Sequence, residues 1–222
     1  MRRQGPAPYN DRMRLRALAA LILTLLPSAA RSQTIEITPL VGHRFGGSLQ
    51  AAPGTGGGSE SSVELEVDDA AAFGVQLGYR VGEGEIELLY ARQNTQLQTA
   101  DLFTGAPVFE LALETWQIGG SYLFGDDDAR ARPFVAVGLG LTRLLPEPSG
   151  LGDETRFSAS FGAGVKLWLG RHFGIRLEGR GFFTVLDSDS RTFCDSDSGC
   201  LIRTTGSELS QAEARAGLIL GF

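Results

Sequence analysis

The feature that most constrains this chain is a long stretch of alternating residues from Arg156 to Val185. Apolar side chains occupy every second position of its first half, and the alternation resumes after a tight turn at 171–174. Such alternation predicts two antiparallel strands with one apolar and one polar face. Each arm reaches ten residues, whereas a soluble strand typically has about 5–6 and a strand that crosses a bilayer needs about 9–11. The hairpin is therefore long enough for a membrane, although a soluble barrel with an apolar interior would alternate in the same way.

The N-terminal 32 residues have the parts of a cleaved secretory signal peptide behind a short extension. Arg14 and Arg16 precede an apolar run, Ala17 to Leu26, and small residues flank Arg31 before Gln33. A run of about ten apolar residues is too short to span roughly 30 Å of hydrocarbon as a helix. We therefore expect residues 1–32 to be removed, which leaves one domain over residues 33–222.

The charge of this domain excludes one class of partner. Of the 20 basic and 26 acidic residues in the chain, 14 and 25 lie after Ser32, so the net charge of the domain is −11. A nucleic-acid partner is not expected for such an acidic chain. Both cysteines, Cys194 and Cys200, fall in one polar segment, and in an exported protein they predict a local disulfide.

From Thr34 onward, the pattern predicts eight long strands joined by connections that alternate between long and short. All long connections then fall on one rim and all tight turns on the other, which is typical of outer-membrane barrels. The longest connections are Gly46 to Asp69 and Ser188 to Gln211. The apolar phase slips between Leu113 and Trp116, which predicts a bulge or a membrane edge. The expected strands are Thr34–Phe45, Ala71–Val81, Glu85–Gln98, about 111–124, Phe134–Leu144, 156–169, 175–185 and Ala212–Phe222.

Aromatic residues of the apolar phase concentrate at the strand ends. Aromatic girdles mark the two interfaces of a membrane barrel, whereas aromatics that merely fill a soluble core would not gather there. The residues near the short turns are Tyr79, Tyr122, Phe124, Phe173 and Phe222, and those near the long connections are Phe45, Phe73, Trp116, Phe157 and Phe183.

Charged residues collect in the opposite phase. Each would cost several kcal/mol in lipid, so we expect them to face a narrow lumen closed mainly by ion pairs, with Phe134, Trp168 and Phe182 helping to fill it. The expected charge network is Glu36, Arg80, Glu87, Lys166, Arg176, Glu178, Arg180, Glu213 and Arg215.

Four segments carry a family resemblance: FGAGVKLWLGRHFGIRLEGRGFF, FVAVGLGLT, WQIGGSYLF and the terminal AGLILGF. They resemble the OmpA-like outer-membrane β-barrel domain family of Gram-negative bacteria, from about Thr34 to Phe222. The resemblance implies an all-β, eight-stranded antiparallel up-and-down transmembrane β-barrel, embedded in outer-membrane lipid. Phe222 on the last strand is similar to the signal that the barrel-assembly machinery recognises.

No motif in the chain predicts an enzyme or a cofactor. His43 lies near a long connection and close to Ser48, and a lipid A-modifying enzyme that uses this pair is the lowest-ranked hypothesis. The acidic residues around Cys194, which are Asp187, Asp189, Asp195 and Asp197, lack the spacing of an EF-hand, and calcium binding there is a hypothesis.

The leading functional prediction is a non-enzymatic outer-membrane protein with a structural or surface-interaction role. Its termini would be periplasmic, and its long acidic connections would be extracellular and meet external ligands. A narrow pore for small solutes or ions is the alternative. A secreted soluble barrel of the lipocalin type would instead require an apolar interior.

Overall fold

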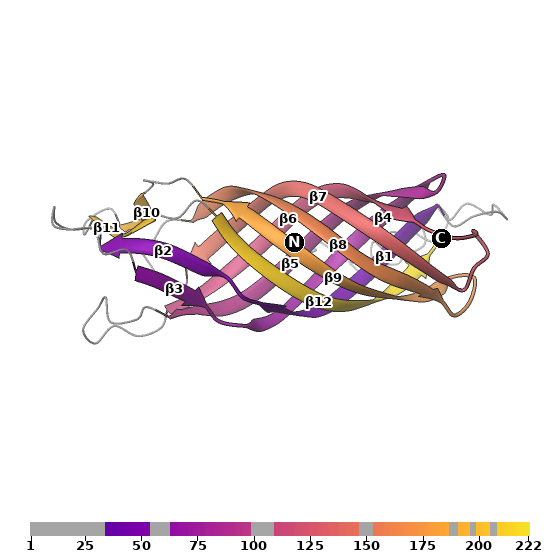
Figure 1. The fold of residues 1–222 in the computed structure, drawn as a ribbon, viewed down its shortest axis with the longest axis horizontal. Helices are drawn as coiled ribbons and strands as arrows, with labels where there is room; N and C mark the ends of the chain where they lie inside the picture. Colours follow the sequence, from indigo (N-terminus) through magenta and orange to yellow (C-terminus); the bar gives the residue numbers. More distant parts are fainter. Residues whose placement is uncertain are drawn as a thin grey trace, which may run out of the picture. The chain divides into compact units, whose positions relative to one another are not determined.

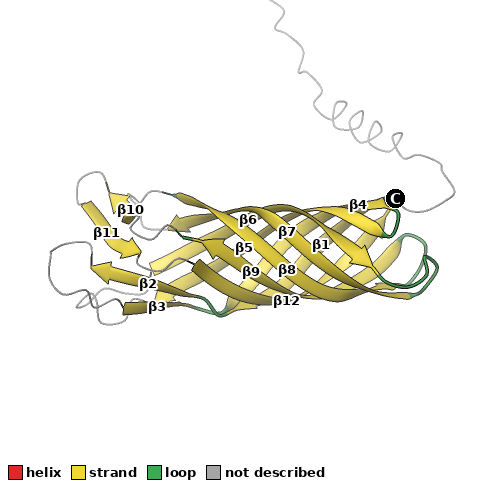
Figure 2. Ribbon diagram, turned by 45° about the horizontal axis from the view of Figure 1, so that its top comes forward, coloured by secondary structure: helices red, strands yellow, loops and turns green. Residues whose placement is uncertain are grey.

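The structure is a computed structural model that describes residues 34–53, 63–98, 109–146, 153–186, 191–195, 199–204 and 208–222. Within these ranges, 49–53, 63–65, 97–98, 109, 191–195 and 199–204 are described by their backbone alone. All regular elements in the described ranges are β-strands (Figure 2). In these ranges, no helix is long and apolar enough to cross a membrane. The predicted signal peptide, residues 1–32, lies outside them.

Eight long antiparallel strands close into a barrel, as the alternation predicted. Each pairs with its neighbours along the chain, β1 pairs with β12, and the pairing of β5 with β6 completes the ring. In Figure 1 these strands run at a common tilt around the barrel. They are β1 (Ile35–Phe45), β4 (Ala70–Val81), β5 (Gly84–Gln98), β6 (Phe109–Leu123), β7 (Ala131–Pro146), β8 (Glu154–Trp168), β9 (Phe173–Val185) and β12 (Glu208–Gly221).

Register partners followed around the ring give the size of the barrel. The circuit leaves β1 at Ile35 and returns to β1 at Phe45, a stagger of ten residues, passing through Tyr79, Ile86, Gly120, Val137, Phe161, Gly181 and Ala212. With strands about 4.8 Å apart and about 3.3 Å per residue, this stagger gives a tilt of about 41°. Eight strands at this tilt leave an interior that side chains can fill.

The connections divide between two rims, as predicted. Residues 82–83, 124–130 and 169–172 are the short connections, and they lie at the same end as Gly221, where β12 ends (Figures 1 and 2). We call this end the short-turn rim and the opposite end the long-connection rim. Gly82 and Gly125 adopt positive φ angles of 62° and 88° at these turns, a conformation that glycine accepts without steric cost.

The first and last long connections are not plain loops, which corrects the sequence-based expectation. Four further strands extend beyond the barrel at the long-connection rim (Figure 1). β2 pairs with both β3 and β11, and β11 pairs with β10, so the two connections share one four-stranded sheet. These strands are β2 (Ser48–Pro53), β3 (Val63–Val67), β10 (Arg191–Asp195) and β11 (Gly199–Thr204). The alternation of Val63, Leu65 and Val67 predicted an extension of the following strand, and the structure forms it as β3. The other three strands are short and are bordered by Gly- and Ser-rich residues, so periodicity did not reveal them.

A bulge joins this sheet to the barrel wall. Val67 pairs with Leu97 and Ala72 pairs with Gln93, so five steps on the β3–β4 side face four steps on β5. Gly46 and Gly47, which connect β1 to β2, lie beside this bulge, and Gly47 O accepts a hydrogen bond from Val67 N. Their φ angles are 73° and 117°. Because an extra residue reverses which face each later side chain occupies, Val67 points inward and is buried although β4 turns its even-numbered residues inward.

Of the two alternatives for the phase slip between Leu113 and Trp116, the bulge is wrong, and the membrane edge stays a prediction. The register of β6 with β5 and with β7 runs without interruption through these residues. Leu113 therefore faces the interior and is fully buried, whereas Trp116 is exposed on the outside. The apparent slip in the sequence is a change in the interior itself, which becomes apolar near the long-connection rim.

The barrel is apolar outside and charged inside. Val137, Leu139 and Phe161 are more than half exposed, whereas Lys166 and Arg176 are 1% exposed. A soluble barrel would have the reverse distribution, because water favours exposed charges and a buried apolar core. This distribution supports a strand-built membrane protein.

We expect Gly164→Ala to lower the free energy of unfolding by about 1–3 kcal/mol, a typical cost of overpacking. An added Cβ would lie 2.1 Å from the carbonyl oxygen of Leu177 and 2.7 Å from the ring of Phe134. Urea unfolding in detergent micelles, followed by heat-modifiable gel migration, measures the change.

Gly179→Ala is the matched control in the same hairpin. Its Cβ would meet nothing within 4 Å, so we expect a change within about 0.5 kcal/mol. Equal losses in the two variants would contradict the close packing around Gly164.

Candidate functional site

The lumen of the barrel is the principal candidate site, because it gathers most of the charged side chains that sequence analysis singled out. The structure buries all of them except Arg80, which is 14% exposed at the short-turn rim. The buried residues are Glu36, Glu87, Lys166, Arg176, Glu178, Arg180, Glu213 and Arg215.

One carboxylate organises the middle of the lumen. Glu178 accepts hydrogen bonds from Arg176 Nε at 2.7 Å, Arg180 Nε at 2.7 Å and Arg215 Nη2 at 2.9 Å. Arg176 and Arg180 follow alternate positions of β9 and therefore share the inner face with Glu178, while β12 brings Arg215 alongside. Charge-assisted bonds of this kind are about twice as strong as neutral ones, so Glu178 holds three guanidinium groups in fixed positions.

A second carboxylate crosses the lumen from another strand. Glu87 on β5 lies 3.0 Å from Arg176 and 3.3 Å from Arg180. Arg180 also donates to Ser160, whose hydroxyl donates in turn to Gln117 at 2.6 Å. The network thus ties together strands on opposite sides of the barrel, and the sequence separations of its members hide it from local motif analysis.

A separate ion-pair group closes the short-turn end. Lys166 Nζ binds Glu36 at 2.5 Å and also binds Glu85. Arg80 reaches Glu36 at 3.5 Å, and Asp127, in a short connection, pairs with Arg132 at 2.7 Å. Phe134 packs above this group, with the guanidinium of Arg176 lying 4.0 Å from its ring centroid.

The long-connection end of the lumen changes from charged to apolar. Arg44 and Glu213 are direct register partners across the β1–β12 pairing and form a 2.7 Å ion pair, with Phe182 4.1 Å from the guanidinium. Gln93 and Gln211 bond to each other nearer the rim. Beyond them, four inward-facing leucines are at most 1% exposed, namely Leu111, Leu113, Leu144 and Leu209. We call these four residues the leucine cap.

Three further charged residues belong to the lumen, although the sequence analysis did not include them in the expected charge network. Arg44, Glu85 and Arg132 are all buried and ion-paired. Each has the same parity as a recognised inward residue of its own strand, so strict counting from Glu36, Glu87 and Phe134 would have found them. All three lie near strand ends, and the expected strands contained Arg44 and Glu85 but began after Arg132.

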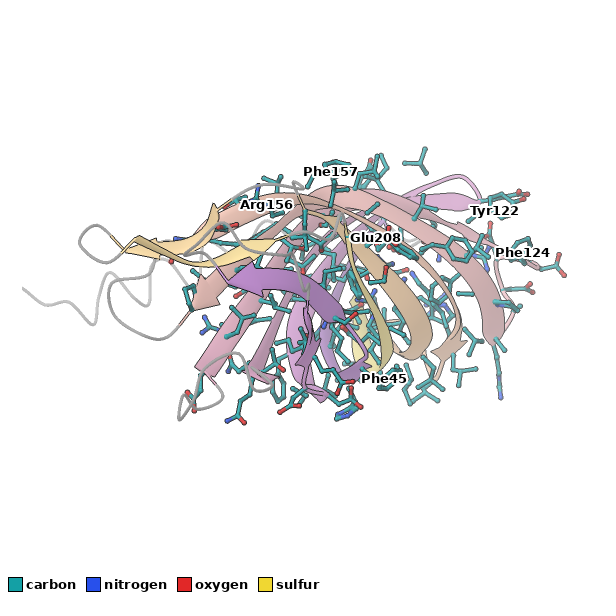
Figure 3. The ribbon with its side chains drawn as sticks, turned by 60° about the vertical axis from the view of Figure 1, so that its left-hand side comes forward. Phe45, Tyr122, Phe124, Arg156, Phe157 and Glu208 are labelled. Atoms are coloured by element: carbon teal, nitrogen blue, oxygen red, sulfur yellow. The ribbon has the colours of Figure 1, made fainter. Side chains whose placement is uncertain are left out.

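The ten predicted girdle aromatics all lie on the outer surface. Their exposed fractions run from 37% for Phe45 to 61% for Phe73. Figure 3 shows Tyr122 and Phe124 outside the barrel at one end, and Phe45 and Phe157 outside it farther toward the other. The remaining members are Tyr79, Trp116, Phe173, Phe183 and Phe222, which are exposed as well.

The other predicted residues do not join the lumen. His43 faces outward beside Phe45, with ring centroids 5.7 Å apart, and His172 contacts the backbone oxygen of Gly221. Cys194 and Cys200 are opposite each other in the β10–β11 register, but only their backbone is described, so the disulfide stays a prediction. The hypothesis of calcium binding near Cys194 also stays a prediction. Of its acidic residues, Asp187, Asp189 and Asp197 lie outside the described residues, and the side chain of Asp195 is not described.

The ion pairs of the lumen hold its side chains in fixed positions. Its charges are paired across the barrel and covered at one end by the leucine cap. Nowhere in the described ranges do three or more His, Cys, Asp or Glu residues form a group that could hold a metal ion.

The comparison with protein families decides where the chain belongs. The model of the outer membrane protein beta-barrel domain matches residues 17–207. The chain belongs to this family. A search of curated proteins found no significant match.

Solved structures similar to this family member are small barrels of low sequence identity. AlkL, determined in lipid bilayers, is 15% identical with a TM-score of 0.59, over 100% of this chain and 97% of AlkL. OprG from Pseudomonas aeruginosa is 11% identical with a TM-score of 0.55, over 86% and 97%. Neisserial surface protein A is 15% identical with a TM-score of 0.54, over 85% and 97%. At these identities the similarity shows the fold alone.

We expect Glu178→Gln to destabilise the folded barrel by about 3–5 kcal/mol, because it leaves buried guanidinium charge without its carboxylate. Urea titration of the refolded barrel in micelles measures the loss.

Asp153→Asn is the control, since it removes the partner of Arg143 from a pair whose side chains are 45% and 49% exposed. An exposed pair contributes up to about 1 kcal/mol. A loss at Glu178 no larger than that at Asp153 would contradict the role assigned to the lumen network.

Proposed function

We propose that this outer-membrane barrel is a non-enzymatic, non-conducting scaffold that displays a structured extracellular sheet to surface partners. The observation that carries the proposal is the junction of β2 with β11, which joins the first and last long connections into one four-stranded sheet beyond the barrel. Paired strands hold backbone groups in place, so a partner meets a surface already ordered before binding.

Charge indicates the kind of partner. Residues 46–69, which contain β2 and β3, carry five carboxylates and no lysine or arginine. A basic surface on the partner would therefore be attracted to this connection, with a strength that falls as salt screens the charges. With this sheet on the extracellular side, the termini are periplasmic. Phe222 is then available to the barrel-assembly machinery before insertion.

The filled lumen supports the non-conducting part of the proposal. The central ion pairs occupy the cross-section, and an ion leaving them would next meet the leucine cap, an apolar constriction of the kind that closes channels by excluding water. Selective conduction would require these pairs to separate.

Planar-bilayer recording tests the closed lumen. We expect no stable single-channel steps from the refolded full chain. Steps whose conductance changes in Arg176→Ala or Arg180→Ala would establish the alternative, a narrow pore, because those side chains fill the middle of the lumen.

Replacement of the extracellular sheet tests surface interaction. An Asn-Gly turn placed between Ser48 and Glu66 keeps their existing register, and a Gly-Ser linker replaces residues 191–204. We expect cross-linking from the full chain in nanodiscs to capture a basic extracellular protein at low salt, and the trimmed variant to capture at least tenfold less. Equal capture by both forms, or none by either, would overturn the display role, and unchanged heat-modifiable migration would show that the trimmed barrel is folded.

A further inference from the structure

The outer face of β5 and β6 differs from the rest of the barrel wall. Outward-facing residues of β5 are apolar only as far as Tyr90, after which come Arg92, Asn94 and Gln96. By contrast, β9 turns no polar side chain outward before its end at Val185. The polar half of β5 therefore lies above the lipid-facing belt, on the side of the long-connection rim.

An aromatic pair marks the boundary between the two halves. Tyr90 and Trp116 are register partners whose rings lie 4.4 Å apart, and they stand where Tyr and Trp gather at a membrane interface. Directly above them, Arg92 Nη1 donates to Glu114 at 2.8 Å, and Arg92 Nε donates to Asn94 Oδ1 at 3.0 Å. These bonds orient the Asn94 amide on the wall.

A cavity of about 320 Å³ lies immediately beyond the hydrogen bonds of Arg92 with Glu114 and Asn94. It is bounded by the bulge between β3 and β4 on one side and by the start of β6 on the other. Its lining residues are Asp68, Asp69, Ala70, Asn94, Thr95, Gln96, Glu110, Leu111 and Ala112. Asn94 and Gln96 stand about 13 and 20 Å from Tyr90 along the strand, at about 3.3 Å per residue.

The shape of this cavity is held by backbone and side-chain bonds. Asp68 N donates to the oxygen of Gln96 at 2.9 Å, Thr95 Oγ1 donates to the oxygen of Asp68 at 2.5 Å, and Asp69 Oδ1 accepts from Gly46 N at 3.0 Å. The bulge is thus fixed to β5 and to β1, so the cavity belongs to the rigid wall. Small-molecule sites are usually largely preformed in this way.

We propose that this cavity binds a neutral or amino sugar, either as the headgroup of a glycolipid in the adjacent leaflet or as a free glycan. Amide side chains both donate and accept hydrogen bonds, and carboxylates accept them, so Asn94, Gln96 and the acidic lining suit ligands with many hydroxyl groups. Three carboxylates in the lining, from Asp68, Asp69 and Glu110, would repel a phosphorylated ligand. The nearby aromatic pair and the apolar belt place a lipid-anchored sugar within reach.

The sequence provides a reporter for this site. Asparagine occurs only at positions 10 and 94, so the full chain labelled with ¹⁵N-asparagine gives two side-chain amide signals, and Asn94→Ala identifies the one at the cavity. The probes are trehalose, trehalose 6-phosphate, and phosphatidylcholine nanodiscs with or without a diglucosyl diacylglycerol.

We expect trehalose or the glycolipid to shift the Asn94 signal in a saturable manner, and trehalose 6-phosphate to bind at least tenfold more weakly than trehalose. Gln96→Ala should weaken binding about tenfold, since one hydrogen bond within a polar site contributes about 1 kcal/mol or slightly more. Thr155→Ala, an exposed polar change on β8, should leave binding unchanged.

The two sources of sugar give different results. A shift with the glycolipid alone identifies a membrane-anchored ligand, and a comparable shift with trehalose identifies a free glycan. Saturable binding by neither probe, or tighter binding of the phosphorylated sugar, would overturn the proposal. The scaffold function does not depend on this outcome, because the pairing of β2 with β11 forms the extracellular sheet whether or not the cavity binds a sugar.

Discussion

Closure of the strand ladder is the constraint on which the rest of the structure depends. In hydrocarbon no water is available to bond an open strand edge, so the pairings of β5 with β6 and of β1 with β12 must complete the ring. Once eight strands close with a stagger of ten residues, the radius is set. The lumen must then be filled by whatever inward side chains the sequence supplies.

The filling is graded along the barrel axis. Lysine and carboxylates close the short-turn end, guanidinium groups share Glu178 in the middle, and leucines close the other end. Large charged side chains fill volume as effectively as apolar ones, and pairing offsets part of the cost of removing them from water. The same alternation that gives lipid an apolar surface thereby supplies the interior with groups that must find partners across it.

The fold could be predicted from the sequence because strand length and alternation follow directly from the membrane. Long strands, their order and the two rims all come from local patterns, as does the outward position of Phe45 or Trp116. The identities of the ion-pair partners in the lumen do not come from local patterns, because Glu87 and Arg176 meet only after the ring has closed. Leu113 misled the analysis because an apolar lumen residue has the same appearance in sequence as a lipid-facing one. The cavity beside Asn94 depends on a one-residue bulge, which periodicity does not reveal.

The junction of β2 with β11 also affects how the barrel wall can move. β2 follows β1, and β11 precedes β12, so the sheet that they form spans the seam where the first and last barrel strands meet. Any lateral gate that parted β1 from β12 at this end would have to break the β2–β11 ladder as well as the Arg44–Glu213 pair. The sheet therefore links the two strands across the seam, so separation of β1 from β12 is least favourable at this end.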